Sequence, residues 1–148
     1  MKENPALGIV RDLVESYETE ARLFKEVIQY TERGEELATG GDFSALCDCL
    51  LGRGERIEAI AQLEAERRNL EKEFSGRIPE DVEEAREQAL ISHGKAILAN
   101  NRLRSILVEH KVILEEEIAA LEHSKIATRA YGEVSASSSS SMFLDRER

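Results

Sequence analysis

The chain has 148 residues, 41% hydrophobic and 34% charged, which predicts a single domain with one core. Thirty acidic residues against twenty basic ones give a formal net charge of −10, and no basic cluster of the kind that phosphate binding requires is present, which argues against a nucleic-acid partner. The absence of Trp, an aromatic content of 5% and only two prolines argue against a β-sandwich or barrel and favour helices.

The N-terminal residues and the two cysteines of the chain indicate in which cellular compartment the protein is expected. Asp12 and Glu15 interrupt the first apolar stretch, so it does not resemble a signal peptide, and no apolar run is long enough to insert into a membrane. Cys47 and Cys49 are two residues apart in an expected helix, where their side chains point in different directions and cannot easily bond to each other. We therefore expect reduced thiols and a cytoplasmic protein.

A first helix is predicted from Pro5 to about Leu37. Its apolar residues recur at alternating steps of four and three, as in the seam of a coiled coil. They are Val10, Val14, Tyr17, Ala21, Phe24 and Ile28, and the stripe is widened by Leu13 and Val27. The segment Thr39-Gly40-Gly41 ends this helix, and Asp42 is suited to cap the next one.

A second helix follows Asp42 and ends near Ser75-Gly76. Gly52 and Gly54 lie in its middle and predict a bend or a close approach of another helix. Its expected core residues are Phe43, Leu46, Leu50, Ile57, Ile60, Leu63, Leu70 and Phe74.

A third helix begins after Pro79, where a run of acidic residues suits the first turn, and it extends to about Arg129. Its apolar side carries Val82, Ala85, Ala89, Ala96, Leu103, Leu107, Leu114, Ile118 and Leu121. At 1.5 Å per residue the first two helices would be roughly 50 Å long and the third roughly 75 Å, so the third would extend about 25 Å further. We expect an all-α fold, an elongated antiparallel three-helix bundle or coiled coil over residues 1–129. A Ser-rich, disordered tail is expected over residues 130–148.

The extra length of the third helix is the predicted binding surface. Apolar residues there would have no neighbouring helix to cover them, and exposed apolar stripes indicate helix binding or self-association. The residues predicted to bind a client are Leu107, Ile113, Leu114, Ile118 and Leu121. Two alternatives stay open: the helix folds back at Gly94 and buries these residues, or they form a homodimer interface.

Catalytic and cofactor sites are not indicated. His93, His110 and His123 lack the spacing of helical metal ligands, and Cys47-x-Cys49 lacks both a second pair and the redox Cys-x-x-Cys spacing. The acidic runs are typical of solvated helix faces, and no glycine loop carries the Lys of a phosphate-binding motif. We therefore expect no enzymatic activity, no metal and no cofactor.

The order of these features resembles the FlgN family of flagellar type III export chaperones. The resemblance is carried by the turn Gly40-Gly41-Asp42-Phe43, a second helix with Arg67, a long third helix with Asn101, and the tail segments Tyr131-Gly132 and Phe143-Leu144-Asp145. In relatives a Gly follows the Tyr several residues on, whereas Gly132 follows Tyr131 directly. The resemblance covers nearly the whole chain.

The resemblance implies a cytoplasmic chaperone in flagellum biogenesis and type III secretion. Such a protein binds the C-terminal helical segments of the hook-filament junction proteins FlgK and FlgL, prevents their premature assembly and delivers them for export, without a cofactor. It also implies docking on the export gate protein FlhA, which we assign to Tyr131. The rival interpretations are a FliT-like chaperone for the filament cap protein FliD, and a homo-oligomeric coiled-coil scaffold with no client.

Overall fold

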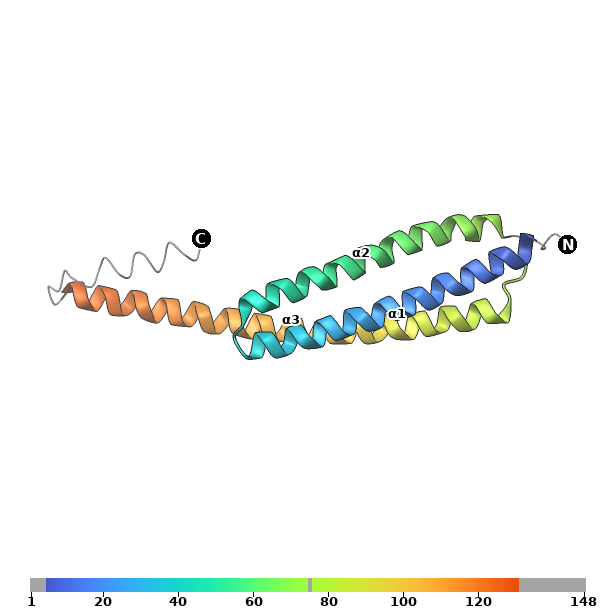
Figure 1. Cartoon of the computed structure of the whole chain (residues 1–148). Coiled ribbons are helices and arrows are strands. Elements are labelled where there is room, and N and C mark those ends of the chain that lie inside the picture. Colours follow the sequence, from blue (N-terminus) through green and yellow to red (C-terminus); the bar gives the residue numbers. More distant parts are fainter. Residues whose placement is uncertain (1–4, 75, 131–148) are drawn as a thin grey trace. The chain divides into compact units, whose positions relative to one another are not determined.

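Three α-helices make up the fold in the computed structural model, which describes residues 5–74 and 76–130, with side chains for 6–74 and 76–126. They are α1 (Pro5–Thr39), α2 (Phe43–Glu73) and α3 (Glu80–Ala130) (Figure 1). The predicted all-α three-helix fold is confirmed, and α3 runs through Gly94 without a break. The chain divides into two compact units, Met1–Ile106 and Leu107–Arg148. Ala130, predicted to begin the tail, is instead the last residue of α3, and the rest of the predicted tail, residues 131–148, lies outside the described residues.

The helices end where local sequence signals predict. Gly41 takes a positive φ of 77°, which suits a residue without a side chain, and Asp42 accepts a hydrogen bond from the backbone N–H of Ala45 at 3.1 Å. At the start of α3, the carbonyl of Pro79 accepts from the N–H groups of Val82 and Glu83. These caps satisfy backbone groups that a helix end leaves open, so the turns are fixed locally.

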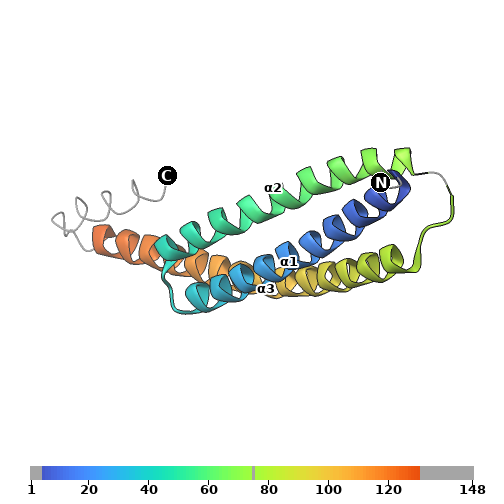
Figure 2. The ribbon, with the colours of Figure 1, turned by 45° about the vertical axis from the view of Figure 1, so that its right-hand side comes forward.

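In the first unit, α1 runs between α2 and the first part of α3 (Figures 1 and 2). Its buried residues follow steps of four and three, as predicted, but in a register that includes polar residues. They are Leu13, Tyr17, Glu20, Phe24, Val27, Thr31, Gly34 and Ala38, and Ser16 beside this row is buried as well. The predicted seam residues Val10, Val14, Ala21 and Ile28 are only half-buried. The prediction considered apolar residues only and so left out Glu20 and Thr31, which explains why the predicted and observed buried rows differ.

The packed side of α3 in the first unit consists mainly of small residues. The buried set is Val82, Ala85, Ala89, Ser92, Ala96, Ala99 and Leu103. Val82, Ala85 and Ala89 pack with Leu13 and Tyr17 of α1, and Ala96 packs with Phe24, Val27 and Ile60. Small residues let one helix approach another closely, so this helix fits against α1 without large side chains.

A buried charged layer joins α1 to α2. The Arg67 guanidinium donates to the Glu20 carboxylate at 2.9 Å, with the two side chains only 11% and 7% exposed. The same guanidinium lies over the Tyr17 ring, 4.0 Å from its centroid, and the Tyr17 hydroxyl donates to Glu71 at 2.9 Å. Every buried polar side-chain atom that the described residues contain has a hydrogen-bond partner. The layer is therefore a satisfied network within the core.

Burial shifts the pKa values of two groups in this layer. Desolvation raises the pKa of the Glu20 carboxyl above its ordinary value of 4.5, against the opposing effect of Arg67. Desolvation, with the hydrogen bond to Glu71, also raises the pKa of Tyr17 above 10.0. Both groups are therefore held more strongly in the protonated form than they would be in water.

The register of α2 also differs from the prediction. Phe43 and Ile57, assigned to its apolar stripe, are 43% and 47% exposed, whereas Cys49 and Arg67 are buried. Arg56 explains part of the difference, because its guanidinium lies over the Tyr30 ring, 4.9 Å from the centroid. Gly52 allows this stack: a Cβ atom there would lie 2.6 Å from Cε1 of Tyr30. The predicted close approach at this glycine is thus made by an aromatic side chain.

Replacing Arg67 by methionine should destabilise the fold by about 3 kcal/mol, because Glu20 would stay buried without its cation. Urea unfolding followed by circular dichroism measures this effect. Arg68→Met, at an exposed neighbouring position, should change stability little. The double variant Arg67→Met with Glu20→Leu should recover much of the loss, since no charge is then buried. Equal midpoints for Arg67→Met and Arg68→Met would contradict the buried pair.

The raised pKa of Glu20 predicts a pH dependence with a defined sign. Between 4.5 and the raised pKa the folded protein keeps a proton that the unfolded chain has lost, so the free energy of unfolding falls as pH rises through this window. Glu20→Gln cannot titrate, so its stability relative to the wild type should rise with pH there. Unfolding at a series of pH values measures the slope. Glu18→Gln, which removes a carboxylate from an exposed position, is the matched control; equal trends in the two variants would contradict the assignment.

Two glycines of α2 offer a matched pair of alanine substitutions. Alanine normally stabilises a helix interior by about 1 kcal/mol relative to glycine. We expect this gain for Gly54→Ala, where a new Cβ would meet nothing within 4 Å. Gly52→Ala should lose stability instead, because the Tyr30 ring would have to move. Thermal unfolding compares the two variants, and a gain at both positions would exclude the tight contact at Gly52.

Candidate functional site

The predicted client-binding residues lie in the second unit, on α3. Ile113, Leu114 and Leu121 are 49%, 43% and 58% exposed, and Leu107 and Ile118 are half-buried. Within the first unit, by contrast, Leu103 of the same helix is 2% exposed. Five aliphatic residues of the second unit are thus accessible to solvent to a substantial extent.

Their spacing places four of them along one side of the helix. Leu107, Leu114 and Leu121 are seven residues apart, and Ile118 follows Leu114 by four, which is the a/d spacing of a coiled-coil seam. Ile113 directly precedes Leu114 and is turned about 100° from it, so it extends the apolar surface around the helix. We name these five residues the α3 stripe. A row of this kind fits the apolar side of another amphipathic helix.

The surroundings of the α3 stripe are apolar and acidic. Further exposed aliphatics stand on other sides of the helix, namely Val108, Val112 and Ile126 at 55%, 47% and 64% exposure. Glu115, Glu116 and Glu117 are exposed as well, and Glu115 pairs with Lys111 at 3.9 Å. Exposed ion pairs of this type contribute little stability, so the carboxylates remain available to a basic partner.

Tyr131, which we assign to export-gate docking, lies outside the described residues. So do the tail segments on which the resemblance to FlgN chaperones partly rests. Arg67, the second-helix residue in that resemblance, is a buried member of the charged layer. Its contacts within the core account for an arginine at this position without a binding partner.

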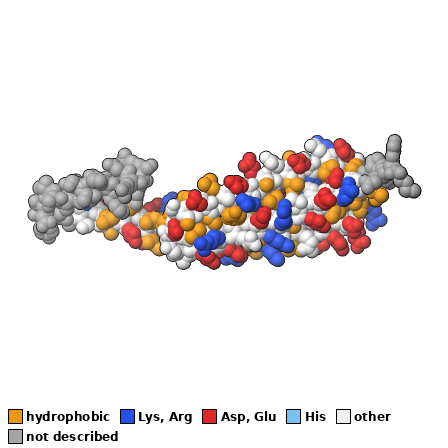
Figure 3. Space-filling view, viewed as in Figure 1, with side chains coloured by type: hydrophobic (Ala, Val, Ile, Leu, Met, Phe, Trp, Pro, Cys, Tyr) orange, Lys and Arg blue, Asp and Glu red, His pale blue; other side chains and the backbone are white. Residues whose placement is uncertain are grey.

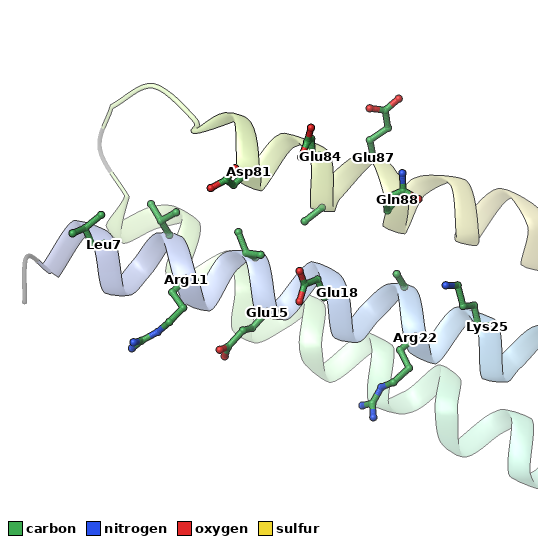
Figure 4. Close-up of a pocket in the computed structure, with 14 residues that line it drawn as sticks. Leu7, Arg11, Glu15, Glu18, Arg22, Lys25, Asp81, Glu84, Glu87 and Gln88 are labelled. Atoms are coloured by element: carbon green, nitrogen blue, oxygen red, sulfur yellow. The ribbon is translucent and has the colours of Figure 1, made fainter.

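A groove between α1 and the start of α3 is a second surface feature of the first unit (Figure 4). Its less exposed lining residues are apolar: Val10, Val14, Ala21 and Ala85. The α3 side contributes acids, including Asp81 and Glu84, and acidic side chains gather over the first turns of α3 (Figure 3). The α1 side contributes both acidic and basic side chains. The groove is open to water along its length, which does not suit chemistry that requires a water-excluded cleft.

His93 and the two cysteines each have a defined environment. The His93 ring stacks on Phe24 with centroids 4.7 Å apart. Cys47 is exposed, whereas Cys49 is buried and donates to the backbone carbonyl of Tyr30 at 3.0 Å, and neither forms a disulfide. Over residues 5–74 and 76–130, no three His, Cys, Asp or Glu residues are grouped so as to hold a metal ion. None of the helices in that part of the chain could cross a membrane.

The chain was compared with models of protein families, with curated proteins and with solved structures. None of the three comparisons gives a match. The resemblance to FlgN chaperones therefore stays a hypothesis, which rests on the order of helices, turns and tail segments in this sequence.

Proposed function

We propose that this chain is an export chaperone of the FlgN type, which binds amphipathic C-terminal helices of the junction proteins FlgK and FlgL. The observation that carries this proposal is the exposure of the α3 stripe, where Ile113, Leu114 and Leu121 are 43–58% exposed. Moving a row of large apolar side chains from water to the apolar side of another helix lowers the free energy of the system. A client helix supplies that surface.

The proposed mechanism is coverage of the client's assembly surface. An amphipathic helix laid along the α3 stripe would bury its own apolar side, which would otherwise pair with other subunits. Each half-exposed aliphatic residue contributes about 1 kcal/mol on burial, before the entropic cost of association is subtracted. The stripe alone therefore gives a modest gain, and we expect a reversible complex, as release at export requires.

The charge of the chain bears on the kind of helix that the α3 stripe would bind. The net charge is −10, and three consecutive glutamates adjoin the α3 stripe. Such a surface favours helices with basic flanks and raises the rate of their encounter. The free thiols of Cys47 and Cys49 are compatible with a reducing compartment such as the cytoplasm. Delivery to FlhA through Tyr131 is part of the same proposal.

Two rivals predict different partners for the same surface. A FliT-like chaperone would bind the filament cap protein FliD, and a scaffold without a client would use the α3 stripe to bind another copy of itself. Affinities for C-terminal segments of FlgK, FlgL and FliD, measured side by side, separate the first rival. Self-association that is abolished by changes in the α3 stripe would favour the second.

Aspartate in the α3 stripe should weaken client binding. We expect the double variant Leu114→Asp, Ile118→Asp to bind FlgK and FlgL segments at least tenfold more weakly, because a carboxylate would be buried against the client's apolar side. Isothermal titration calorimetry measures the affinity, and circular dichroism verifies that helicity is kept.

Val112→Asp is the matched control. Val112 is 47% exposed, similar to Leu114, but it lies two positions before Leu114, so it points to another side of the helix. Its affinity should stay close to that of the wild type. Unchanged affinity of the Leu114→Asp, Ile118→Asp variant would remove the α3 stripe as the client site, and a wild-type chain that binds neither FlgK nor FlgL would exclude these clients.

A further inference from the structure

A second apolar surface lies in the first unit, on the side of α3 that faces away from the core. Leu90, Ile91, Ile97 and Leu98 are 59%, 44%, 48% and 61% exposed. Successive helix residues are about 100° apart, which puts these four opposite the buried row that includes Ala89 and Ala96. Large aliphatic side chains thus point outward while small ones fill the core. We name Leu90, Ile91, Gly94, Ile97 and Leu98 the outer face of α3.

The outer face reads the same in both directions along the chain. Leu90 and Leu98 are each four residues from Gly94, and Ile91 and Ile97 are each three residues from it. A two-fold symmetric interface uses the same patch on both copies, so the patch has to be complementary to itself. When two such helices pack antiparallel about Gly94, Leu90 meets Ile97 of the second copy and Ile91 meets Leu98. Each large side chain then covers another.

Gly94 suits the centre of such a contact. It lies inside a helix, which glycine destabilises relative to alanine. A Cβ atom at this position would meet nothing within 4 Å. Packing within the chain therefore does not require glycine here. The missing side chain would allow two helix backbones to cross closely at the symmetry axis.

Two polar residues favour the antiparallel direction. Glu87 and Asn101 are both exposed, on the same side of α3 as the outer face, seven residues before and after Gly94. Parallel packing would put the Glu87 carboxylates of the two copies together, which is repulsive. Antiparallel packing puts Glu87 of each copy beside Asn101 of the other, whose amide can donate a hydrogen bond.

We propose that two copies of this chain associate antiparallel through the outer face of α3, with Gly94 at the two-fold axis. The contact is short: residues 90–98 span about 12 Å of helix. Stable dimers bury roughly 800 Å² on each partner, more than this patch offers. The edges of the patch carry charges of both signs, which add little net attraction; these residues are Glu84, Arg86, Arg102 and Arg104. The dimer is therefore weak, with a dissociation constant on the order of 10⁻⁴ M.

Disulfide trapping tests the direction of packing. In a Cys47→Ser background, which removes the exposed native thiol, Glu87→Cys and Asn101→Cys chains of different size are mixed and mildly oxidised. Antiparallel packing yields mainly the mixed Glu87→Cys/Asn101→Cys dimer. Gln88→Cys, shifted by one residue to another side of the helix, should cross-link poorly with Asn101→Cys. Products in which each variant pairs mainly with itself would overturn the antiparallel arrangement.

Sedimentation equilibrium from about 10 µM to about 1 mM tests the surface itself. The wild type should shift from monomer towards dimer, and Leu90→Glu with Leu98→Glu should weaken dimerisation at least tenfold while helicity is kept. Val112→Glu, in the second unit, should dimerise like the wild type. A chain that stays monomeric throughout overturns the proposal, as does self-association that survives the changes at Leu90 and Leu98. Client binding uses other residues, so its failure would leave this result unaffected.

Discussion

The buried pair of Arg67 and Glu20 is the constraint on which the arrangement of the first two helices depends. Apolar seams repeat every seven residues, so two such helices could slide past each other by one repeat with little loss of apolar contact. The charged pair cannot follow such a slide, because both charges would remain buried without a partner. Tyr17 and Glu71 extend the pair into a network. We interpret this layer as the device that fixes the register of α1 and α2.

Where the apolar residues of α3 lie follows from how that helix is packed. In the first unit its core side is built from alanines, serine and few larger residues, so its large aliphatics are left on the outer face. In the second unit the core row continues in sequence as the α3 stripe, whose residues are half-buried or exposed. The helix thus offers two separate apolar surfaces, one proposed for a client and one for a second copy. Their separation lets each be tested without the other.

Much of the fold could be predicted from the sequence, because its helix ends depend on local residues. Asp42 and Pro79 mark the starts of α2 and α3, and the predicted end of α1 at Leu37 differs from the observed end by two residues. The side that faces the core was harder to predict. Glu20 and Thr31 occupy core positions because each finds a hydrogen-bond partner, Thr31 in the carbonyl of Val27 and Glu20 in Arg67. Thr31 bonds within its own helix, whereas the partner of Glu20, like the stack on Tyr30, comes from a residue far away in the sequence. The outer face was present in the sequence as a symmetric pattern, but a search for one apolar stripe per helix passes over it.

The alanine side of α3 has a mechanical consequence. Alanine loses no rotamers on burial and buries little area, so most contacts of this helix are small and nearly interchangeable. Leu103 is the exception, as the large apolar side chain that is almost fully enclosed. The largest single packing contact of α3 in the first unit is therefore made at Leu103, a few residues before the chain continues into the second unit. A load applied beyond that point would act on the contacts of Leu103 before it reached the turns near Val82.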